Sequence, residues 1–236
     1  MSSREITVAE RQKILQGHFL FGELTEADRE VLVNYSRLEN YRDGETIFLK
    51  GSPGRGMMAV LRGEVRISAP STDGREIVLN LIRPGEIFGE ISLLDGKDRS
   101  ANAQAIGDCV LFVIERRDFL PFIEKRPGLA LRLLAIMCER LRRTTQQVED
   151  VLFLDLPSRL AKQLLALAAA GGRVTAQGFR VETKISQGEL GHRIGVSRES
   201  INRQLGKWQH EGVLEIDGSI ITILDETALQ SLVDTV

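Results

Sequence analysis

Closely spaced glycines limit what the first half of this chain can fold into. Ten of the 22 glycines fall between residues 44 and 107, at Gly44, Gly51, Gly54, Gly56, Gly63, Gly74, Gly85, Gly89, Gly96 and Gly107. Short runs of β-forming residues separate them: Thr46–Leu49, Met57–Leu61, Glu64–Ala69, Glu76–Ile82, Ala103–Ile106 and Val110–Ile114. Short strands joined by glycine turns are typical of antiparallel sandwiches and barrels. The stretch therefore predicts an antiparallel β domain rather than a doubly wound α/β sheet.

Composition and charge narrow the class further. A chain of 236 residues with 42% hydrophobic and 27% charged residues indicates one large or two ordinary globular domains. The formal net charge of −2 shows no overall basicity of the kind that indicates nucleic-acid binding. The N-terminus lacks the apolar core of a signal peptide, and no apolar run reaches the length of a membrane span. We therefore expect a cytoplasmic protein.

Helical periodicity occurs at both ends of this β-rich stretch. The first 36 residues are expected to be largely helical, with Thr25 as an N-cap. The pattern turns helical again from Arg116, and the segment Gly128–Leu154 is the longest helix expected. Its apolar residues follow one another at alternating steps of three and four, at Leu134, Met137, Leu141, Val148 and Val151, with Thr144 completing the seam. This heptad spacing favours a parallel coiled coil over a helix packed on its own domain.

Thr144 is a polar residue within that apolar seam. A polar seam residue usually costs stability and sets register, and it can also be a place where a polar ligand is received.

A domain hinge is expected at residues 153–157, because Pro157 interrupts the pattern there. Beyond it, a Leu- and Ala-rich helix over Ser158–Ala170 should close at the Gly171–Gly172 pair.

Two short helices joined by a tight turn are predicted near the C-terminus. Ser186 begins the first as an N-cap, with Glu189 at the capping-box position, and the helix runs to about Ile194. A turn over residues 195–197 follows, and Ser197 caps a second helix that reaches about His210. Two short helices with a glycine-containing turn form a helix-turn-helix.

The faces of the second helix support this interpretation. At 100° per residue, one side carries the apolar residues Ile201, Leu205 and Trp208. An adjoining arc of roughly 140° carries the polar residues Arg198, Glu199, Asn202 and Arg203. Arginine can bind guanine with two hydrogen bonds and glutamate can accept one from cytosine, although a solvated charged face is the ordinary alternative. A two-stranded wing over Val213–Ile216 and Ile220–Leu224, with an Asp-Gly turn, should follow.

A loop in the β domain combines the groups that hold a sugar phosphate. Gly89 and Glu90 precede Arg99 and Ser100 by a short interval. Glycine lets the backbone approach a ligand, a carboxylate accepts hydrogen bonds from sugar hydroxyls, and a guanidinium binds phosphate oxygens with a fixed fork of donors. The alternative is a surface loop with a Glu–Arg ion pair.

Cysteine and histidine content bears on cofactors and catalysis. Cys109 and Cys138 lie in apolar contexts and are expected to be buried thiols rather than a disulfide or a metal pair. Two cysteines cannot supply a four-thiolate iron–sulfur cluster, and the three histidines give little support to a haem sensor. No nucleophile–base pairing or metal-ligand spacing is evident. We therefore expect a binding protein without a metal, and not an enzyme.

Taken in order, these features resemble the cyclic AMP receptor protein family (Crp/Fnr superfamily) of bacterial transcription regulators. Three segments carry the resemblance: FGEISLLDGKDRSA at residues 88–101, RLRRTTQQV at 140–148 and SRESINR at 197–203. The resemblance implies an α+β protein. An antiparallel β jelly-roll domain for cyclic nucleotides would cover residues 1–127, a dimerisation helix and hinge 128–155, and a winged helix-turn-helix 156–236.

The resemblance also implies which residues touch the effector, cyclic AMP or cyclic GMP. Gly89 and Glu90 would bind the ribose 2′-hydroxyl, and Arg99 and Ser100 the cyclic phosphate. Thr144 would bind the purine, and Thr145 would reach the ligand in the partner subunit. The other implied contacts are Ile91, Ala101, Arg140, Val65 and Leu79, of which the last two would pack on the base.

For DNA, the resemblance implies that a homodimer binds a palindromic operator with TGTGA-like half-sites, with RNA polymerase as a further partner. The implied DNA contacts are Ser197, Arg198, Glu199, Asn202 and Arg203. Two departures stand out: Gly206 occupies a position where the family often has lysine, and Thr145 one where serine is frequent. A threonine hydroxyl both donates and accepts, so Thr144 suits adenine or guanine alike. A different effector, or constitutive DNA binding, stays an alternative.

Overall fold

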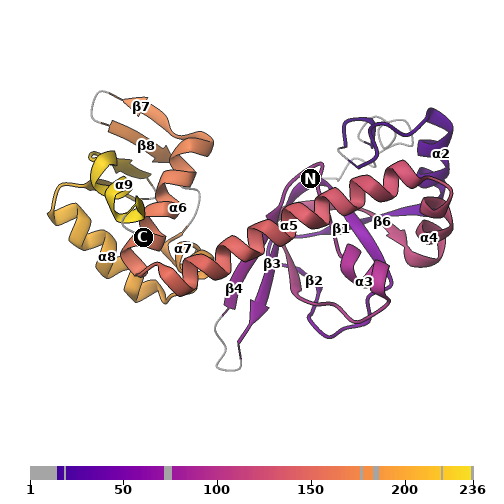
Figure 1. Cartoon of the computed structure of the whole chain (residues 1–236), viewed down its shortest axis with the longest axis horizontal. Coiled ribbons are helices and arrows are strands. Elements are labelled where there is room, and N and C mark those ends of the chain that lie inside the picture. Colours follow the sequence, from indigo (N-terminus) through magenta and orange to yellow (C-terminus); the bar gives the residue numbers. More distant parts are fainter. Residues whose placement is uncertain are drawn as a thin grey trace. The chain divides into compact units, whose positions relative to one another are not determined.

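The structure is a computed structural model, and it describes residues 15–18, 20–71, 76–175, 178–182, 186–218 and 220–234. The chain divides into two compact units: residues 1–74 with 79–140, here called the strand domain, and residues 75–78 with 141–236, the C-terminal unit. The division falls inside helix α5 (Pro127–Phe153), between Arg140 and Leu141 (Figure 1). Residues 1–14 and Phe19, part of the expected N-terminal helical region, lie outside the described residues.

An antiparallel sheet forms the strand domain, as the glycine spacing predicts. Its strands are β1 (Ser36–Tyr41), β2 (Thr46–Phe48), β3 (Gly56–Pro70), β4 (Glu76–Ile82), β5 (Ile87–Phe88) and β6 (Asn102–Glu115). They lie in the order β1-β6-β3-β4, while β2 pairs with β6 and β5 pairs with β3. The long strands β3 and β6 make up the centre of this sheet (Figure 1).

The prediction of two short strands in place of each of β3 and β6 is wrong. The β3–β6 pairing continues through the predicted break, with register shifts between Val60 and Glu64. Gly63 lies in that interval at a φ of 79°, and a Cβ atom there would lie 2.6 Å from Cys109 Sγ on the opposite strand. Glycine therefore permits a bulge at this point instead of ending the strand. Turn and bulge call for the same residue, so the sequence pattern alone does not distinguish them.

Two hydrophobic clusters lie on opposite faces of the central strands. Helices α2 (Glu26–Tyr35), α4 (Arg116–Glu124) and the first turns of α5 pack against one face, where β6 contributes Phe112. The neighbouring residue Leu111 belongs to the other cluster, together with Val65 and Ile82. This alternation follows from the two-residue period of a strand. The predicted N-cap of α2 is confirmed, since Thr25 Oγ1 accepts a hydrogen bond from the Asp28 amide at 3.1 Å.

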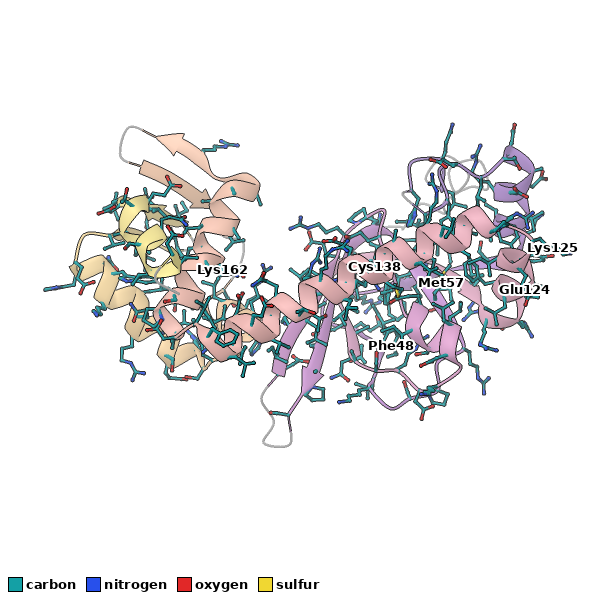
Figure 2. All side chains as sticks on the ribbon, in the orientation of Figure 1. Phe48, Met57, Glu124, Lys125, Cys138 and Lys162 are labelled. Atoms are coloured by element: carbon teal, nitrogen blue, oxygen red, sulfur yellow. The ribbon has the colours of Figure 1, made fainter. Side chains whose placement is uncertain are left out.

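The two cysteines differ, and the prediction that both are buried holds only for Cys109. Cys138, labelled on α5 in Figure 2, is exposed. On this helix Leu129 and Leu133 are the buried residues. Cys138 comes five residues after Leu133, which rotates its side chain about 140° from that contact. An apolar context in the sequence therefore does not tell which side of the helix is covered.

The C-terminal unit is built from helices around a small sheet. Its elements after α5 are α6 (Leu156–Gly171), β7 (Arg173–Thr175), β8 (Gly178–Glu182), α7 (Gln187–Ile194), α8 (Arg198–His210), β9 (Leu214–Asp217), β10 (Ile220–Ile223) and α9 (Glu226–Asp234). The strands lie in the order β7-β8-β10-β9, so the predicted two-stranded wing is half of a four-stranded sheet. Buried leucines of α6, α7 and α9 pack with Trp208 of α8 in one core.

Helix α6 begins two residues earlier than predicted. The Asp155 carboxylate accepts a hydrogen bond from the Ser158 amide at 2.9 Å and so caps the helix. Pro157 then lies in the first turn, where a missing N–H costs nothing. The same proline that interrupts the preceding helical pattern therefore helps to begin the next helix.

Candidate functional site

The loop predicted to bind an anion is organised around Gly89. This residue precedes the short helix α3 (Glu90–Asp95) and has a left-handed conformation with a φ of 75°. The Arg99 guanidinium lies against it, and Nη1 donates a hydrogen bond to the Gly89 carbonyl at 2.8 Å. A Cβ atom at position 89 would come within 2.5 Å of that nitrogen. Glycine is therefore required here both for the turn and for the close approach of the guanidinium.

Glu90 is the buried carboxylate of this site, with only 1% of its surface exposed. Its Oε1 forms an ion pair with Arg140 Nη1 at 2.6 Å, and Arg140 also donates to the Ile87 carbonyl. The other oxygen, Oε2, is buried and has no hydrogen-bond partner among the residues that the structure describes. A buried acceptor without a partner is costly unless a ligand donates to it. The arrangement therefore suits a hydroxyl donor.

Arg99 supplies a buried positive charge, since it is only 6% exposed. Burial lowers the pKa of Arg99 from its usual value, and the negative charge of Glu90 opposes that change. The Arg99 Nε is buried without a hydrogen-bond partner in the described part of the chain. The alternative of a surface loop closed by a Glu90–Arg99 ion pair is wrong, because both side chains are buried and Glu90 pairs with Arg140.

The backbone around Arg99 is held in place at several points. The Arg99 amide donates to the Ser52 carbonyl at 2.9 Å, and the Gly51 amide donates to the Arg99 carbonyl at 2.8 Å. On the other side of the loop, Arg116 Nε donates to the Leu93 carbonyl near the end of α3 at 2.7 Å. These bonds come from segments distant in sequence, the turn after β2 and the start of α4, so the loop conformation is not set by the loop alone.

The remaining residues predicted to contact a ligand differ in exposure. Ser100 and Ile91 are exposed in the same loop, whereas Ala101 is buried. Val65 is fully buried in β3 and Leu79 is half-buried in β4. Thr144 and Thr145 are exposed on α5 and belong to the C-terminal unit.

Helix α5 presents an apolar stripe to solvent from Leu134 to Val151. Leu134, Leu141, Val148 and Val151 of the predicted seam are each more than half exposed, and Leu141 reaches 67%. Met137 is the exception, because it packs against the core of the strand domain. An exposed stripe at heptad spacing is typical of a helix that pairs with another helix. The same stripe argues against a helix that packs only on its own domain.

The predicted helix-turn-helix is confirmed as α7 and α8. Ser186 and Ser197 cap the two helices, accepting hydrogen bonds from the Glu189 and Ser200 amides at 3.2 Å. On α8, Ile201, Leu205 and Trp208 are buried, as predicted. The polar residues Arg198, Glu199, Asn202 and Arg203 are all exposed. Packing of the apolar face therefore turns this polar face to solvent.

Electrostatics at the start of α8 favour a charged carboxylate. The Glu199 side chain accepts hydrogen bonds from its own backbone amide and from Ser197, and these hold the pKa of Glu199 below its usual value.

The end of α7 is held by a side chain of α6. Arg159 Nη1 donates to the Ile194 carbonyl at 3.0 Å, which supports the end of α7. Positive φ at Gly195, 72°, ends α7 and makes the tight turn that the sequence predicts.

Metal-binding clusters and membrane-spanning helices are both absent from the described residues. No group of three or more histidine, cysteine, aspartate or glutamate side chains there could hold a metal ion. None of the described helices is long and apolar enough to cross a membrane.

Sequence comparisons match both halves of the chain. The cyclic nucleotide-binding domain family matches residues 38–126, and the Crp-like helix-turn-helix domain family matches residues 158–232. A CRP-like cAMP-activated global transcriptional regulator of Mycobacterium tuberculosis is 34% identical, with 79% of this chain and 83% of the relative covered. The cyclic AMP receptor protein of Thermus thermophilus is 31% identical over 92% of this chain and 98% of its own.

Solved structures show the same architecture. The c-di-GMP responsive global regulator CLP of Xanthomonas campestris matches with a TM-score of 0.75 and 25% identity, covering 84% of this chain and 99% of its own. The Thermus thermophilus catabolite activator protein matches with a TM-score of 0.53 and 31% identity, covering 91% of this chain and 98% of its own.

Proposed function

Because this chain belongs to the cyclic AMP receptor protein family of bacterial transcription regulators, we propose that a cyclic purine nucleotide binds its strand domain and controls operator binding by its homodimer. One observation carries the nucleotide part of the proposal. Arg99 and Glu90 are both buried, and each has a polar atom without a partner among the described residues. A cyclic nucleotide carries the two complementary groups, a phosphate anion and a ribose hydroxyl.

In this proposal the loop binds the sugar and the phosphate. Arg99 and Ser100 donate to the cyclic phosphate, while Gly89 and Glu90 bind the 2′-hydroxyl. The Arg99 Nε and the Glu90 Oε2 are the atoms that such a ligand would satisfy. The surrounding contacts would come from Ile91, Ala101, Arg140, Val65 and Leu79.

The paired α5 helices would carry the signal. Thr144 would bind the purine and Thr145 would reach the ligand of the partner subunit. The exposed apolar stripe of α5 supports a homodimer, because burying it between two copies removes that surface from water. A ligand that binds one dimer arrangement better shifts the population toward it. In the favoured arrangement, the two recognition helices would be about 34 Å apart, one turn of DNA.

The exposed face of α8 would read the operator. Arg198 and Arg203 would bind guanine, Glu199 would accept from cytosine, and Ser197 and Asn202 would complete the contacts. We also propose that the cyclic-nucleotide domain ends at residue 127 and that the DNA-binding domain begins at residue 156. The operator would carry TGTGA-like half-sites, and RNA polymerase would be a further partner. The protein would be cytoplasmic.

The identity of the effector is the open part of the proposal. Cyclic AMP is proposed first, since the relatives from Mycobacterium tuberculosis and Thermus thermophilus are named for it. Cyclic GMP presents the same phosphate and ribose to the same loop. The Xanthomonas campestris regulator is named as responsive to c-di-GMP, so that nucleotide is included in the test.

Two measurements test the proposal. Isothermal calorimetry with cyclic AMP, cyclic GMP and c-di-GMP should show saturable binding of either cyclic AMP or cyclic GMP. Fluorescence anisotropy of a labelled palindromic duplex should then show tighter binding when that nucleotide is present. Equal operator affinity with and without every nucleotide would contradict gating, and binding of c-di-GMP alone would contradict the assigned effector class.

A further inference from the structure

An aromatic ring that no sequence pattern singles out lies against Arg99, the arginine proposed to bind the phosphate. Phe48 ends β2, is half-buried, and packs against the cluster inside the strand domain. The Arg99 Cζ atom lies over its ring, 4.3 Å from the centroid. Figure 2 labels Phe48 among the side chains that fill this domain. The ring in turn neighbours Phe88, with centroids 5.9 Å apart.

We infer that Phe48 is a positioning residue for the effector site: its ring holds the Arg99 guanidinium in the plane from which it binds the cyclic phosphate. The inference rests on the proposed function, because it takes Arg99 to be the phosphate-binding group. It adds a residue of β2 to a site otherwise assigned to the α3 loop, to α5 and to single residues of β3 and β4.

The orientation of Arg99 has few other sources. Its backbone is held by Gly51 and Ser52, but within the described part of the chain its side chain has one hydrogen bond, from Nη1 to the Gly89 carbonyl. One hydrogen bond does not by itself fix rotation of the guanidinium about the line that joins these atoms, so the packing around this buried group has to fix it. An aromatic ring packed against the guanidinium carbon restricts that rotation without using an N–H donor, and a bidentate phosphate contact needs two such donors.

The ring also limits how solvent reaches the guanidinium. A cavity of about 460 Å³ borders the pair, and Phe48, Arg99, Met58 and Val113 contribute to its lining. The cavity's other charged lining residues include Arg37 and Glu39, which pair with each other at 2.8 Å. Arg99 already lines this cavity, and without the ring more of its guanidinium would face solvent there. A better hydrated cation binds phosphate less strongly, because the effective dielectric constant around the pair rises.

Matched variants distinguish the effect of the aromatic ring on nucleotide affinity from the effect of side-chain volume. Phe48→Met keeps an apolar side chain of similar length without a ring, and Phe48→Tyr keeps the ring. Calorimetry should show binding of the cyclic nucleotide weakened about tenfold in Phe48→Met and changed about twofold or less in Phe48→Tyr. Phe112→Met removes a buried ring from the other core cluster of the same domain, and it should leave the affinity within about twofold.

A second readout needs no ligand. In ¹⁵N-labelled protein, the Arg99 Nε–H resonance, assigned by its loss in Arg99→Lys, should be displaced by the ring current of Phe48. The displacement should persist in Phe48→Tyr and vanish in Phe48→Met. An unchanged resonance in Phe48→Met would overturn the inference, as would equal nucleotide affinity in that variant and the wild type. Loss of affinity in Phe48→Tyr as large as in Phe48→Met would also overturn it. Failure of the wild type to bind any cyclic nucleotide would instead refute the proposed function.

Discussion

The strand domain and the C-terminal unit place the arginines of their proposed binding sites in opposite surroundings. In the strand domain, Arg99 is buried, donates to the Gly89 carbonyl and lies against the Phe48 ring. In the C-terminal unit, Arg198 and Arg203 are exposed on a helix whose opposite side is buried in the core. The same side chain is thus fixed before binding in one unit and free to adjust in the other.

This difference matches the two proposed ligands. A buried guanidinium has few orientations and little water to lose, so it suits a small anion of set geometry. Exposed arginines keep their hydration and rotamer freedom, and they suit a polymer whose phosphates are contacted at many points with strong dependence on salt. Burial, and not residue type, decides which task an arginine can perform here.

The chain carries a spectroscopic reporter for each unit. Its one tryptophan, Trp208, lies in the core of the C-terminal unit, while both tyrosines, Tyr35 and Tyr41, lie in the strand domain. Tryptophan fluorescence and tyrosine near-ultraviolet circular dichroism can therefore follow the two units separately. The predictions below use these signals to confine each effect to one half of the molecule.

Truncation of the buried arginine should have the largest effect. Arg99→Ala leaves the phosphate facing Glu90 without its cation, and removal of one partner of a buried charge pair costs about 4 kcal/mol, near 1,000-fold in affinity. Calorimetry with the wild-type effector measures this loss. Lys97→Ala, an exposed lysine in the same loop, is the control and should bind within about twofold of wild type. Retained affinity in Arg99→Ala would show that the phosphate binds elsewhere.

Acid should destabilise the strand domain through His18. This histidine is buried, its Nδ1 accepts from the Leu20 amide at 3.1 Å, and burial lowers its pKa to about 4. Because the unfolded chain, with a pKa near 6.5, binds the proton more tightly, the stability contribution is complete above pH 6.5 and is lost as pH falls toward 4. The integrated loss is about 3 kcal/mol.

Urea denaturation followed by the tyrosine signal should show this dependence between pH 7 and pH 4. His18→Asn offers an amide oxygen in place of Nδ1 but does not titrate, so its stability should be flatter over the same range. A wild-type profile as flat as that of His18→Asn would show that the histidine titrates normally in the folded protein. The Trp208 transition belongs to the other unit and serves as the internal reference.

Truncation of an exposed arginine should have an intermediate effect. Arg203→Ala should weaken operator binding by about 2 kcal/mol, roughly 30-fold, and relax preference at one base position. If Arg203 contacts a phosphate instead, the loss is uniform across sequences and the salt slope falls by about 1. Anisotropy titrations at several salt concentrations separate the two, with exposed Arg62→Ala in the strand domain as a control. Unaltered operator affinity would remove Arg203 from the contact surface.

The smallest expected effect concerns the helix that carries these arginines. Gly206 lies inside α8 with open space around its Cα and no positive φ. Gly206→Ala should therefore stabilise the C-terminal unit by about 1 kcal/mol, as helix propensity predicts. Trp208 fluorescence during urea denaturation measures the change, and the tyrosine transition should not move. Destabilisation would mean that the glycine serves a contact absent from the single chain.

Much of the fold could be predicted because its signals are local. The caps at Thr25, Ser186 and Ser197 precede their helices directly, and the apolar period of α8 identified its buried side. The ends of the strands were harder to predict from the sequence. Gly63 looked like a turn and is a bulge, since that choice depends on whether the chain on the other side continues, and the partner strand lies more than forty residues away in sequence.

The same distinction between local signals and contacts from distant segments applies to the candidate site. Proximity in sequence singled out Gly89, Glu90, Arg99 and Ser100, because a turn and a short loop bring these residues within one segment. The partners of that segment come from elsewhere: Arg140 from α5 pairs with Glu90, and Phe48 from β2 covers Arg99. Neither belongs to a local pattern, and only the resemblance pointed to Arg140.

The sequence by itself therefore determined the caps of α2, α7 and α8, which side of α8 is apolar, and which loop could hold an anion. These properties depend on a few neighbouring residues and on backbone sterics. Only the tertiary structure decided that Arg99 and Glu90 are buried, that Cys138 is exposed, and that Phe48 lies over a guanidinium. Burial and contact arise from segments far apart in sequence, and side-chain periodicity carries no information about which segment will cover a given residue.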